Sequence, residues 1–236
     1  MNKSSVEEIR ARFDKDVERF SNLETGQSAT IDAPLALELI AGAAAATTPH
    51  ATHILDVGCG AGNYTLKLLA KISNMSATLV DLSEPMLQRA EVRVSAATSG
   101  TVTPLQRDVR DCQFPPESFD IITAAAVLHH LRTDDEWRSV FTNFHRWLRP
   151  GGSIWVSDLI IHDDPAIQGL MWERYGEYLT SLKGEKYRDE VFAYILKEDT
   201  PRSLSFQMDL LKSAGFASVE VLHKKSCFAA FGAIRA

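Results

Sequence analysis

The sequence has few cysteines, no long apolar run and no excess of positive charge. Its three cysteines, Cys59, Cys112 and Cys227, lack the spacing of a metal site, so we expect reduced thiols, a cytoplasmic setting and no bound metal. No segment approaches the roughly 20 apolar residues that cross a bilayer, and residues 1–10 lack the apolar core of a signal peptide. We therefore expect no membrane partner.

The charge balance argues against a broad surface for nucleic acid. The formal net charge is −6, and the longest basic run is the pair Lys224 and Lys225. A protein that grips duplex phosphates usually carries clustered positive charge, so we expect no duplex nucleic-acid partner. With 45% hydrophobic residues, the 236-residue chain can bury the core of one α/β domain, and we predict a single domain over residues 1–236.

The most informative segment reads HILDVGCGAGN at residues 53–63. A short apolar run ends in Asp56, three alternating glycines follow, and an amphipathic helical pattern begins at Asn63. This order predicts a buried strand, a tight turn and a helix start whose free N–H groups face a ligand. A dinucleotide loop would need glycine or alanine where Asn63 stands, and the Gly-Lys-Ser/Thr ending of a phosphate loop is absent.

Acidic groups also follow the next two apolar runs. Asp81 ends a run 25 residues after Asp56, where nucleotide-binding α/β folds place a carboxylate for the ribose hydroxyls. Asp108 comes directly after the third run, and a Leu-Arg-Pro-Gly-Gly turn at residues 148–152 precedes the fifth. The second to seventh strands are predicted at residues 77–81, 101–106, 119–125, 153–158, 218–223 and 227–235.

Together these features resemble the class I S-adenosylmethionine (SAM)-dependent methyltransferases, over roughly residues 50–160. The resemblance implies a Rossmann-like α/β fold with a seven-stranded sheet in the order 3-2-1-4-5-7-6, its last strand antiparallel, and helices on both faces. It also implies SAM as cofactor, S-adenosylhomocysteine (SAH) as product, Asp81 at the ribose, and Asp108 with Val109 at the adenine. The residues expected to bind SAM are Asp56, Gly58, Cys59, Gly60, Gly62, Asp81, Leu82, Asp108, Val109 and Ala125.

Several of these residues allow a second interpretation. Asp81 could cap the helix that follows it, and Asp108 could form a turn beside its charged neighbours. Asp56 could hold the glycine loop instead of touching the ligand. We interpret Cys59 as a small loop residue rather than a nucleophile.

The acceptor is expected to be a small or medium-sized molecule. Residues 123–127 read TAAAV, without the Asp/Asn-Pro-Pro-Tyr or Pro-Cys patterns of nucleobase methyltransferases, and are similar to the small-molecule branch that includes ubiquinone and menaquinone enzymes. The reaction implied is an in-line displacement in which positioning supplies much of the catalysis. An oxygen or nitrogen acceptor can also need a base. The sequence leaves that residue open, with the candidates His129, His130, Asp158, Tyr175 and Tyr178.

Two segments lie outside the core pattern. Residues 1–48 predict one helix over residues 6–20 and another over 35–46, which pack on the sheet or form a lid over the SAM pocket. Residues 161–203 form a long helical insert after the fifth strand. This insert is expected to cap the acceptor pocket or to pair subunits in a homodimer, and its Trp172, Tyr175 and Tyr178 are expected to contact the acceptor.

Two other functions stay open. The chain also resembles carboxy-SAM synthase, which makes the carboxylated SAM used in tRNA wobble-uridine modification. That chemistry needs an arginine in the insert to pair with the added carboxylate. A gap-free count back from Gly215 places Phe192 at that position, with Arg188 one helical turn earlier and Arg202 later. The other alternative is a SAM-binding pseudoenzyme that acts as a sensor or partner subunit.

Overall fold

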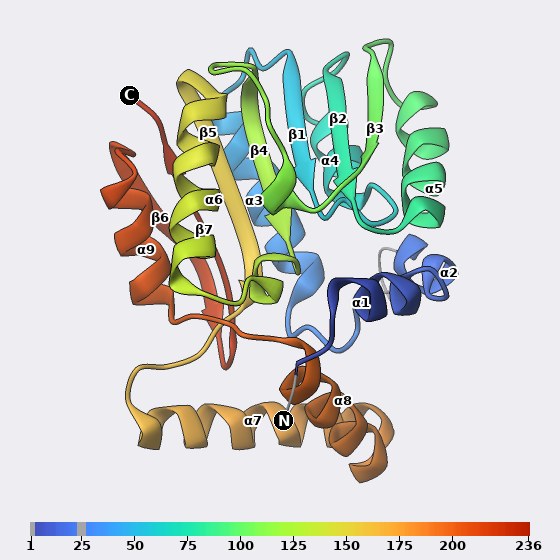
Figure 1. Cartoon of the computed structure of the whole chain (residues 1–236), viewed down its shortest axis with the longest axis vertical. Helices are drawn as coiled ribbons and strands as arrows, with labels where there is room; N and C mark the ends of the chain where they lie inside the picture. The colour runs from blue at the N-terminus through green and yellow to red at the C-terminus, as the bar shows by residue number, and fades with distance from the viewer. Residues whose placement is uncertain (1–2, 23–26) are drawn as a thin grey trace.

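The computed structural model describes residues 3–22 and 27–236. Its centre is a seven-stranded sheet, whose strands are β1 (His53–Val57), β2 (Ser76–Asp81), β3 (Val102–Gln106), β4 (Phe119–Ala125), β5 (Leu148–Leu159), β6 (Ser218–Lys225) and β7 (Phe228–Ile234). The strand order is β3-β2-β1-β4-β5-β7-β6. Strands β1 to β5 pair in parallel, and β7 is antiparallel to both β5 and β6 (Figure 1). The predicted fold and strand order are confirmed.

Helices cover both faces of the sheet because neighbouring side chains of each strand point to opposite sides. Ile54 and Ile121 belong to one buried cluster, whereas the adjacent Leu55 and Ile122 belong to the other. The first cluster includes residues of α3 (Ala33–Thr47), α4 (Asn63–Leu69) and α5 (Glu84–Ser95), and the second includes residues of α6 (Asp134–Trp147) and α9 (Leu204–Ser213). Two apolar layers thus fix the carboxyl ends of β1 to β5 along one edge.

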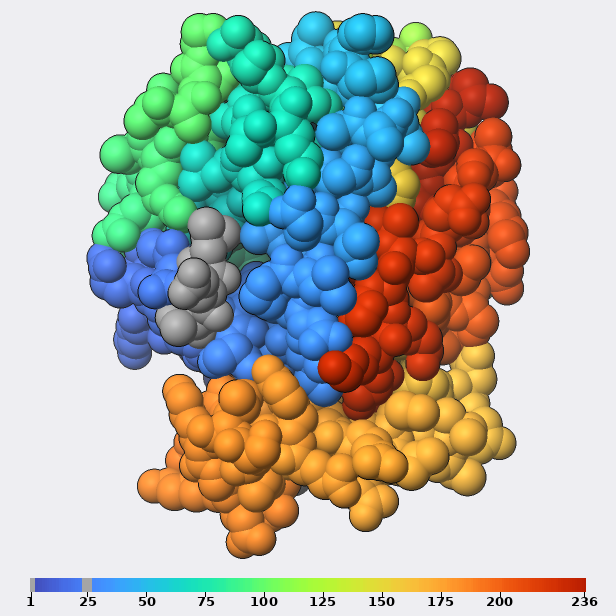
Figure 2. All heavy atoms as spheres, turned by 180° about the vertical axis from the view of Figure 1, so that it is seen from behind, coloured from blue at the N-terminus to red at the C-terminus, as the bar shows by residue number. Residues whose placement is uncertain are grey.

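The remaining helices gather at that edge, and they are α1 (Val6–Phe13), α2 (Val17–Ser21), α7 (Pro165–Lys183) and α8 (Glu185–Glu198). In Figure 1 the pair α7 and α8 forms a separate layer below the sheet, with α1 and α2 beside it. Figure 2 shows the same layer in orange from behind, against the blue N-terminal segment. Tyr175 and Ile195 anchor it in a third apolar cluster with Leu159 and Phe228 from the ends of β5 and β7.

The prediction of one helix over residues 6–20 is wrong. The structure has α1 and α2 there, separated by the charged residues 14–16. In a straight helix Phe13 and Phe20 would lie about 10.5 Å apart along the axis, at roughly 1.5 Å per residue. The break brings their ring centroids to 5.7 Å, and both rings line the same pocket.

The turn predicted at residues 148–152 lies inside β5, which begins at Leu148. It forms an irregularity there: Phe119 pairs with Leu148 and Ile121 with Ser153, and Gly151 has φ +77°. The backbone N–H of Gly151 donates to the carbonyl of Arg235, and the N–H of Arg235 donates to the carbonyl of Gly152. These bonds extend the sheet through the glycines, with a register irregularity against β4. Among the helices of the described ranges, none is long and apolar enough to cross a membrane.

Candidate functional site

Backbone hydrogen bonds fix the position of the glycine loop after β1. Gly58 has φ +66°, and a β-carbon there would lie 2.6 Å from the β-carbon of Val127. The N–H groups of Gly58 and Cys59 donate to the carbonyl of Val80 at 2.8 and 3.0 Å. The loop is therefore pinned to β2, and glycine is required at position 58 for both conformation and space.

Asp56 lies behind this loop and is 1% exposed. One carboxylate oxygen accepts from the Thr123 hydroxyl at 2.8 Å and the other from the Thr65 hydroxyl at 2.7 Å. Burial raises the pKa of the Asp56 carboxyl to about 6, although the two threonine hydrogen bonds act in the opposite direction. Asp56 ties β1 to β4 and α4, which favours the interpretation that it holds the loop.

Asp81 joins the glycine loop to the end of β2. Its carboxylate accepts from the N–H of Gly60 at 2.8 Å and from the N–H of Ser83 at 2.9 Å. Burial raises the pKa of Asp81, and these backbone donors partly offset that effect. Each carboxylate oxygen has a second lone pair, so the group can still accept from two ligand hydroxyls.

Asp108 lies at the end of β3 and is paired with Arg110. Arg110 donates from its backbone N–H and its Nε to one oxygen, both at 2.9 Å, and from Nη2 to the other at 2.6 Å. Burial would raise the pKa of Asp108, but the Arg110 guanidinium holds it below the usual value. Asp108 therefore does form the local turn, and its carboxylate also reaches the pocket wall.

These groups surround a first pocket at the carboxyl ends of β1 to β4, where about 970 Å³ of space includes the solvent at its open side. Eight of the ten residues predicted to bind the cofactor line it: Gly58, Cys59, Gly60, Asp81, Leu82, Asp108, Val109 and Ala125. Gly62 instead packs against α5, where a β-carbon would lie 3.0 Å from a Val94 methyl, and Asp56 lies behind the loop. The sequence analysis missed these wall residues: Phe13, Phe20, Tyr64, Met86 and Leu131.

A second pocket, of about 1330 Å³, adjoins the first. The two share the wall residues Phe13, Phe20, Gln27, Tyr64, Ala125 and Ala126. The second is closed by α1, α2, α7, α8 and the end of β5, and the added aromatic side chains in its wall are Tyr175, Tyr187, Tyr194 and Phe228. Ligands in the first and second pockets would therefore lie next to the same residues.

Of the three aromatic residues expected at the acceptor, Tyr175 lines the second pocket, whereas Tyr178 and Trp172 contact other parts of the chain. Tyr175 lines the second pocket, and its hydroxyl donates to the carbonyl of Ala29 at 2.9 Å. Tyr178 donates to the carbonyl of Ser28 at 2.9 Å, and Trp172 stacks on Phe192 with ring centroids 4.4 Å apart. The two tyrosines thus fasten the insert to the segment before α3. The hydroxyl of Tyr175 is engaged, and burial raises its pKa well above the usual value.

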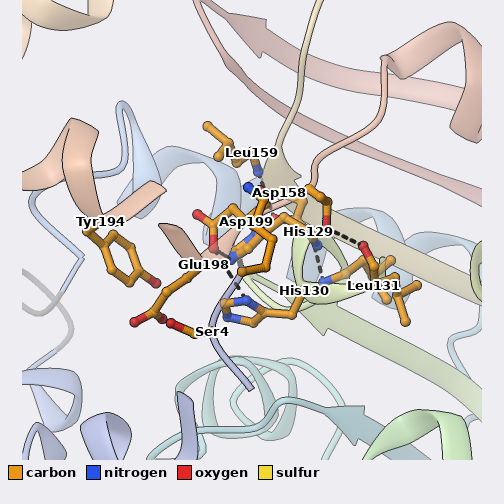
Figure 3. A network of polar contacts seen from close by, with 12 residues as sticks. Ser4, His129, His130, Leu131, Asp158, Leu159, Tyr194, Glu198 and Asp199 are labelled. Carbon is orange, nitrogen blue, oxygen red and sulfur yellow. Dashed lines mark hydrogen bonds and ion pairs between the residues drawn. The ribbon is translucent and has the colours of Figure 1, made fainter. Parts of the chain in front are cut away.

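A polar cluster lies at the border of the two pockets (Figure 3). His129 lies between Asp158, which contacts its Nδ1, and Asp199, whose Oδ1 is 3.7 Å from its Nε2. His130 Nδ1 lies 3.3 Å from the same Asp199 oxygen. The other oxygen of Asp158 accepts from the N–H groups of Leu128 and His129 at 2.9 and 3.2 Å, which fixes the loop after β4.

Burial and neighbouring charges shift the pKa values of His129, His130 and Asp199 in this cluster. Burial alone would lower the pKa of His129. The negative charges of Asp158 and Asp199 together outweigh that effect and raise the pKa to about 9. Burial and the His129 charge lower the pKa of His130 well below its usual value. Burial raises the pKa of the Asp199 carboxyl to about 6. At neutral pH, the His129 ring is therefore protonated on both nitrogens and positively charged, with one carboxylate on each side.

Asp199 is the functional candidate that the sequence analysis missed. It lies directly after α8, whose aromatic residues suggested a cap over the acceptor pocket or a contact between subunits. The signal available was a pair of acids, Glu198 and Asp199, followed by Pro201 at the end of a helix. Because such acids usually face solvent, only the folded arrangement shows that Asp199 is 4% exposed and points at two histidines.

Comparison with known proteins agrees with this geometry. A family profile described as "Methyltransferase domain" matches residues 54–152, which span the glycine loop and strands β1 to β4. The chain is 28% identical over 193 residues to the carboxy-S-adenosyl-L-methionine synthase of Shewanella amazonensis, covering 78% of this chain and 76% of that protein. The matched segment and the strand order are therefore similar to those of SAM-dependent methyltransferases.

Proteins of similar sequence or similar fold vary in chemistry. The malonyl-[acyl-carrier protein] O-methyltransferase of a Paenibacillus species is 35% identical over 103 residues, which cover 43% of this chain and 36% of that protein. The crystal structure of the [4+2]-cyclase SpnF aligns over 100% of this chain and 98% of its own, with a TM-score of 0.65 and 12% identity. The cyclase shows that one fold carries different reactions, so the acceptor must be argued from the pockets.

Proposed function

We propose that this protein binds SAM in the first pocket and transfers its methyl group to a small-molecule acceptor in the second. The observation that supports the proposal is that the two pockets are adjacent and share six lining residues. The glycine loop would receive the amino-acid part of SAM, Asp81 the ribose, and Asp108 with the N–H of Val109 the adenine. The methyl group would then lie near Tyr64 and Ala125, facing the second pocket.

The second pocket suits a flat organic molecule with one ionisable hydroxyl or amine. Its tyrosines supply apolar area, and Asp199, which lies beside the protonated His129 in the wall, offers a carboxylate that can accept the acceptor's proton. Arg12 lines the same pocket, but its guanidinium is held by Glu198 at 3.1 and 3.2 Å and donates to the Tyr194 hydroxyl at 2.8 Å. Its charge is therefore already balanced, which favours an acceptor without a strong negative charge.

Carboxy-SAM synthesis is the second candidate, supported by the similarity to the Shewanella enzyme over most of both chains. The insert offers no arginine to the added carboxylate at the expected position, where Phe192 stacks on Trp172. Arg188 pairs with Asp189 at 2.9 Å, and Arg202 pairs with Asp134 at 2.9 Å. These contacts favour methyl transfer from ordinary SAM.

Turnover separates an enzyme from a SAM-binding pseudoenzyme. We expect the protein, given SAM with a deuterated methyl group and a pool of cellular small molecules, to form SAH together with one or more products that carry the label. Mass spectrometry detects both. The matched reaction with the Asp81→Ala variant should form much less of either product. Binding of SAM without any SAH formation across varied acceptor pools would support the pseudoenzyme instead.

A further inference from the structure

The cluster after β4 has the composition of a metal site. His129 and His130 come from the loop after β4, and Asp199 follows α8, about 70 residues later in the chain. One nitrogen from each histidine and one oxygen of Asp199 all lie within 4.8 Å of one another. We propose that these three side chains bind one divalent transition-metal ion of the zinc class, at the border of the acceptor pocket.

The distances fit a metal better than a set of direct hydrogen bonds. Asp199 Oδ1 is 3.7 Å from His129 Nε2 and 3.3 Å from His130 Nδ1. Ligand atoms on a tetrahedral zinc, with bonds of about 2.0–2.1 Å, lie about 3.3–3.4 Å apart. The two histidine nitrogens lie within 4.8 Å of each other, so a shift of the side chains would bring one ion within bonding distance of all three atoms.

Two of the three proposed ligands are poorly satisfied by hydrogen bonds, although the Glu198 backbone interacts with the His130 ring. Asp199 is 4% exposed, and its Oδ1 makes no aligned hydrogen bond within the described part of the chain. Neither ring nitrogen of His130 makes one either, although both are buried. Buried polar atoms without partners cost free energy, and a metal would satisfy these atoms together.

Asp158 orients the first ligand as carboxylates do in metalloenzymes. It contacts Nδ1 of His129 and accepts from two backbone N–H groups, so the ring is fixed with Nε2 toward Asp199. A histidine that donates one ring N–H to a carboxylate and offers the other nitrogen is the usual arrangement at zinc. The metal would take the place of the proton on His129 Nε2, the nitrogen that faces Asp199.

The cations near the cluster each have a partner of their own, although Arg12 and Arg132 still oppose positive charge on the histidines. Arg12 is paired with Glu198, and Arg132 donates to the carbonyl of Glu198 and to the Thr200 hydroxyl. Lys3 donates to backbone carbonyls of the same segment. The carboxylates of Asp158 and Asp199 thus face the histidines, and two histidines with one carboxylate match the ligands that zinc and iron prefer.

The metal would have an open coordination position toward the substrate, because His129 and Asp199 both line the second pocket. This part of the inference rests on the proposed methyl transfer. An acceptor hydroxyl bound there would have a lowered pKa, lose its proton to solvent, and present its oxygen to the SAM methyl. The sequence analysis expected no metal because it considered cysteine spacing, and this ligand set is assembled only by the fold.

The direct test is metal titration of chelator-treated protein in the absence of SAM. We expect one equivalent of Zn²⁺ by calorimetry, and the visible absorption of four-coordinate Co²⁺ when Co²⁺ is added. His130→Gln and Asp199→Asn should abolish both signals. Asp158→Asn should weaken binding about 10- to 100-fold, because it removes only the group that orients His129. The exposed His50→Gln variant is the matched control and should bind like the unsubstituted protein.

Circular dichroism melts establish that each variant is folded. The absence of saturable binding to the unsubstituted protein would overturn the proposal, as would equal binding by folded His130→Gln and Asp199→Asn variants. SAM calorimetry on the same samples separates the two claims. Metal binding without methyl transfer refutes only the proposed function, and full methyl transfer by metal-free protein refutes only the metal.

Discussion

Replacing Asp81 with alanine is expected to weaken SAM binding by roughly 10- to 150-fold, which corresponds to about 1.5–3 kcal/mol for a lost charged hydrogen-bond partner. The ribose hydroxyls would lose their acceptor. The N–H groups of Gly60 and Ser83 would also lose theirs, so the glycine loop would be less well ordered before SAM arrives. Isothermal calorimetry with SAM and SAH measures the effect.

Two variants control this result. Asp135→Ala removes a carboxylate whose side chain is 94% exposed on α6, and it should leave SAM affinity unchanged. Asp81→Asn keeps the size and one acceptor oxygen, so its loss should be smaller than that of Asp81→Ala. If Asp81→Ala binds SAM as tightly as the unsubstituted protein, Asp81 does not bind the ribose, and the proposed placement of SAM is wrong.

Replacing His129 with alanine is expected to lower the rate of methyl transfer about 100- to 10,000-fold at saturating SAM, the usual contribution of acid–base catalysis, because His129 holds the Asp199 carboxylate in place. The prediction applies whether His129 acts through Asp199 alone or through a bound metal. SAM affinity should be unchanged, because His129 lines the second pocket and does not contact the proposed cofactor groups. Rates of SAH formation together with SAM calorimetry give both quantities.

The control for this variant is His50→Ala, which removes an exposed histidine in the loop before β1. A thermal melt shows whether His129→Ala is folded, since Asp158 loses one of its partners in that variant. A folded His129→Ala protein with an undiminished rate would show that the cluster does not activate the acceptor, and catalysis would then rest on positioning alone.

The core fold could be predicted because each of its signals is local in the sequence. The glycines at 58, 60 and 62 need particular backbone conformations, and Asp56 and Asp81 each end an apolar run. Strand order followed from the family resemblance. The break between α1 and α2 could not be predicted from the apolar spacing, because contact between the Phe13 and Phe20 rings depends on the pocket they enclose.

The acceptor side was harder to predict because its residues meet only in the folded chain. His129, Asp158 and Asp199 come from three elements, and each alone resembles an ordinary loop or helix-end residue. Tyr175 was a sound choice for the pocket wall, but the engagement of its hydroxyl with the Ala29 carbonyl is a long-range contact. Trp172 was expected at the acceptor, and the structure places it against Phe192.

Mass spectrometry of the small molecule that co-purifies with the protein tests the central claim most directly. The protein should be isolated without added ligand, denatured, and its released nucleosides compared with authentic standards. We predict SAM or SAH in a stoichiometric amount, together with calorimetric binding of both by the emptied protein. A carboxylated SAM as the released ligand would contradict this account and assign the chain to carboxy-SAM synthesis.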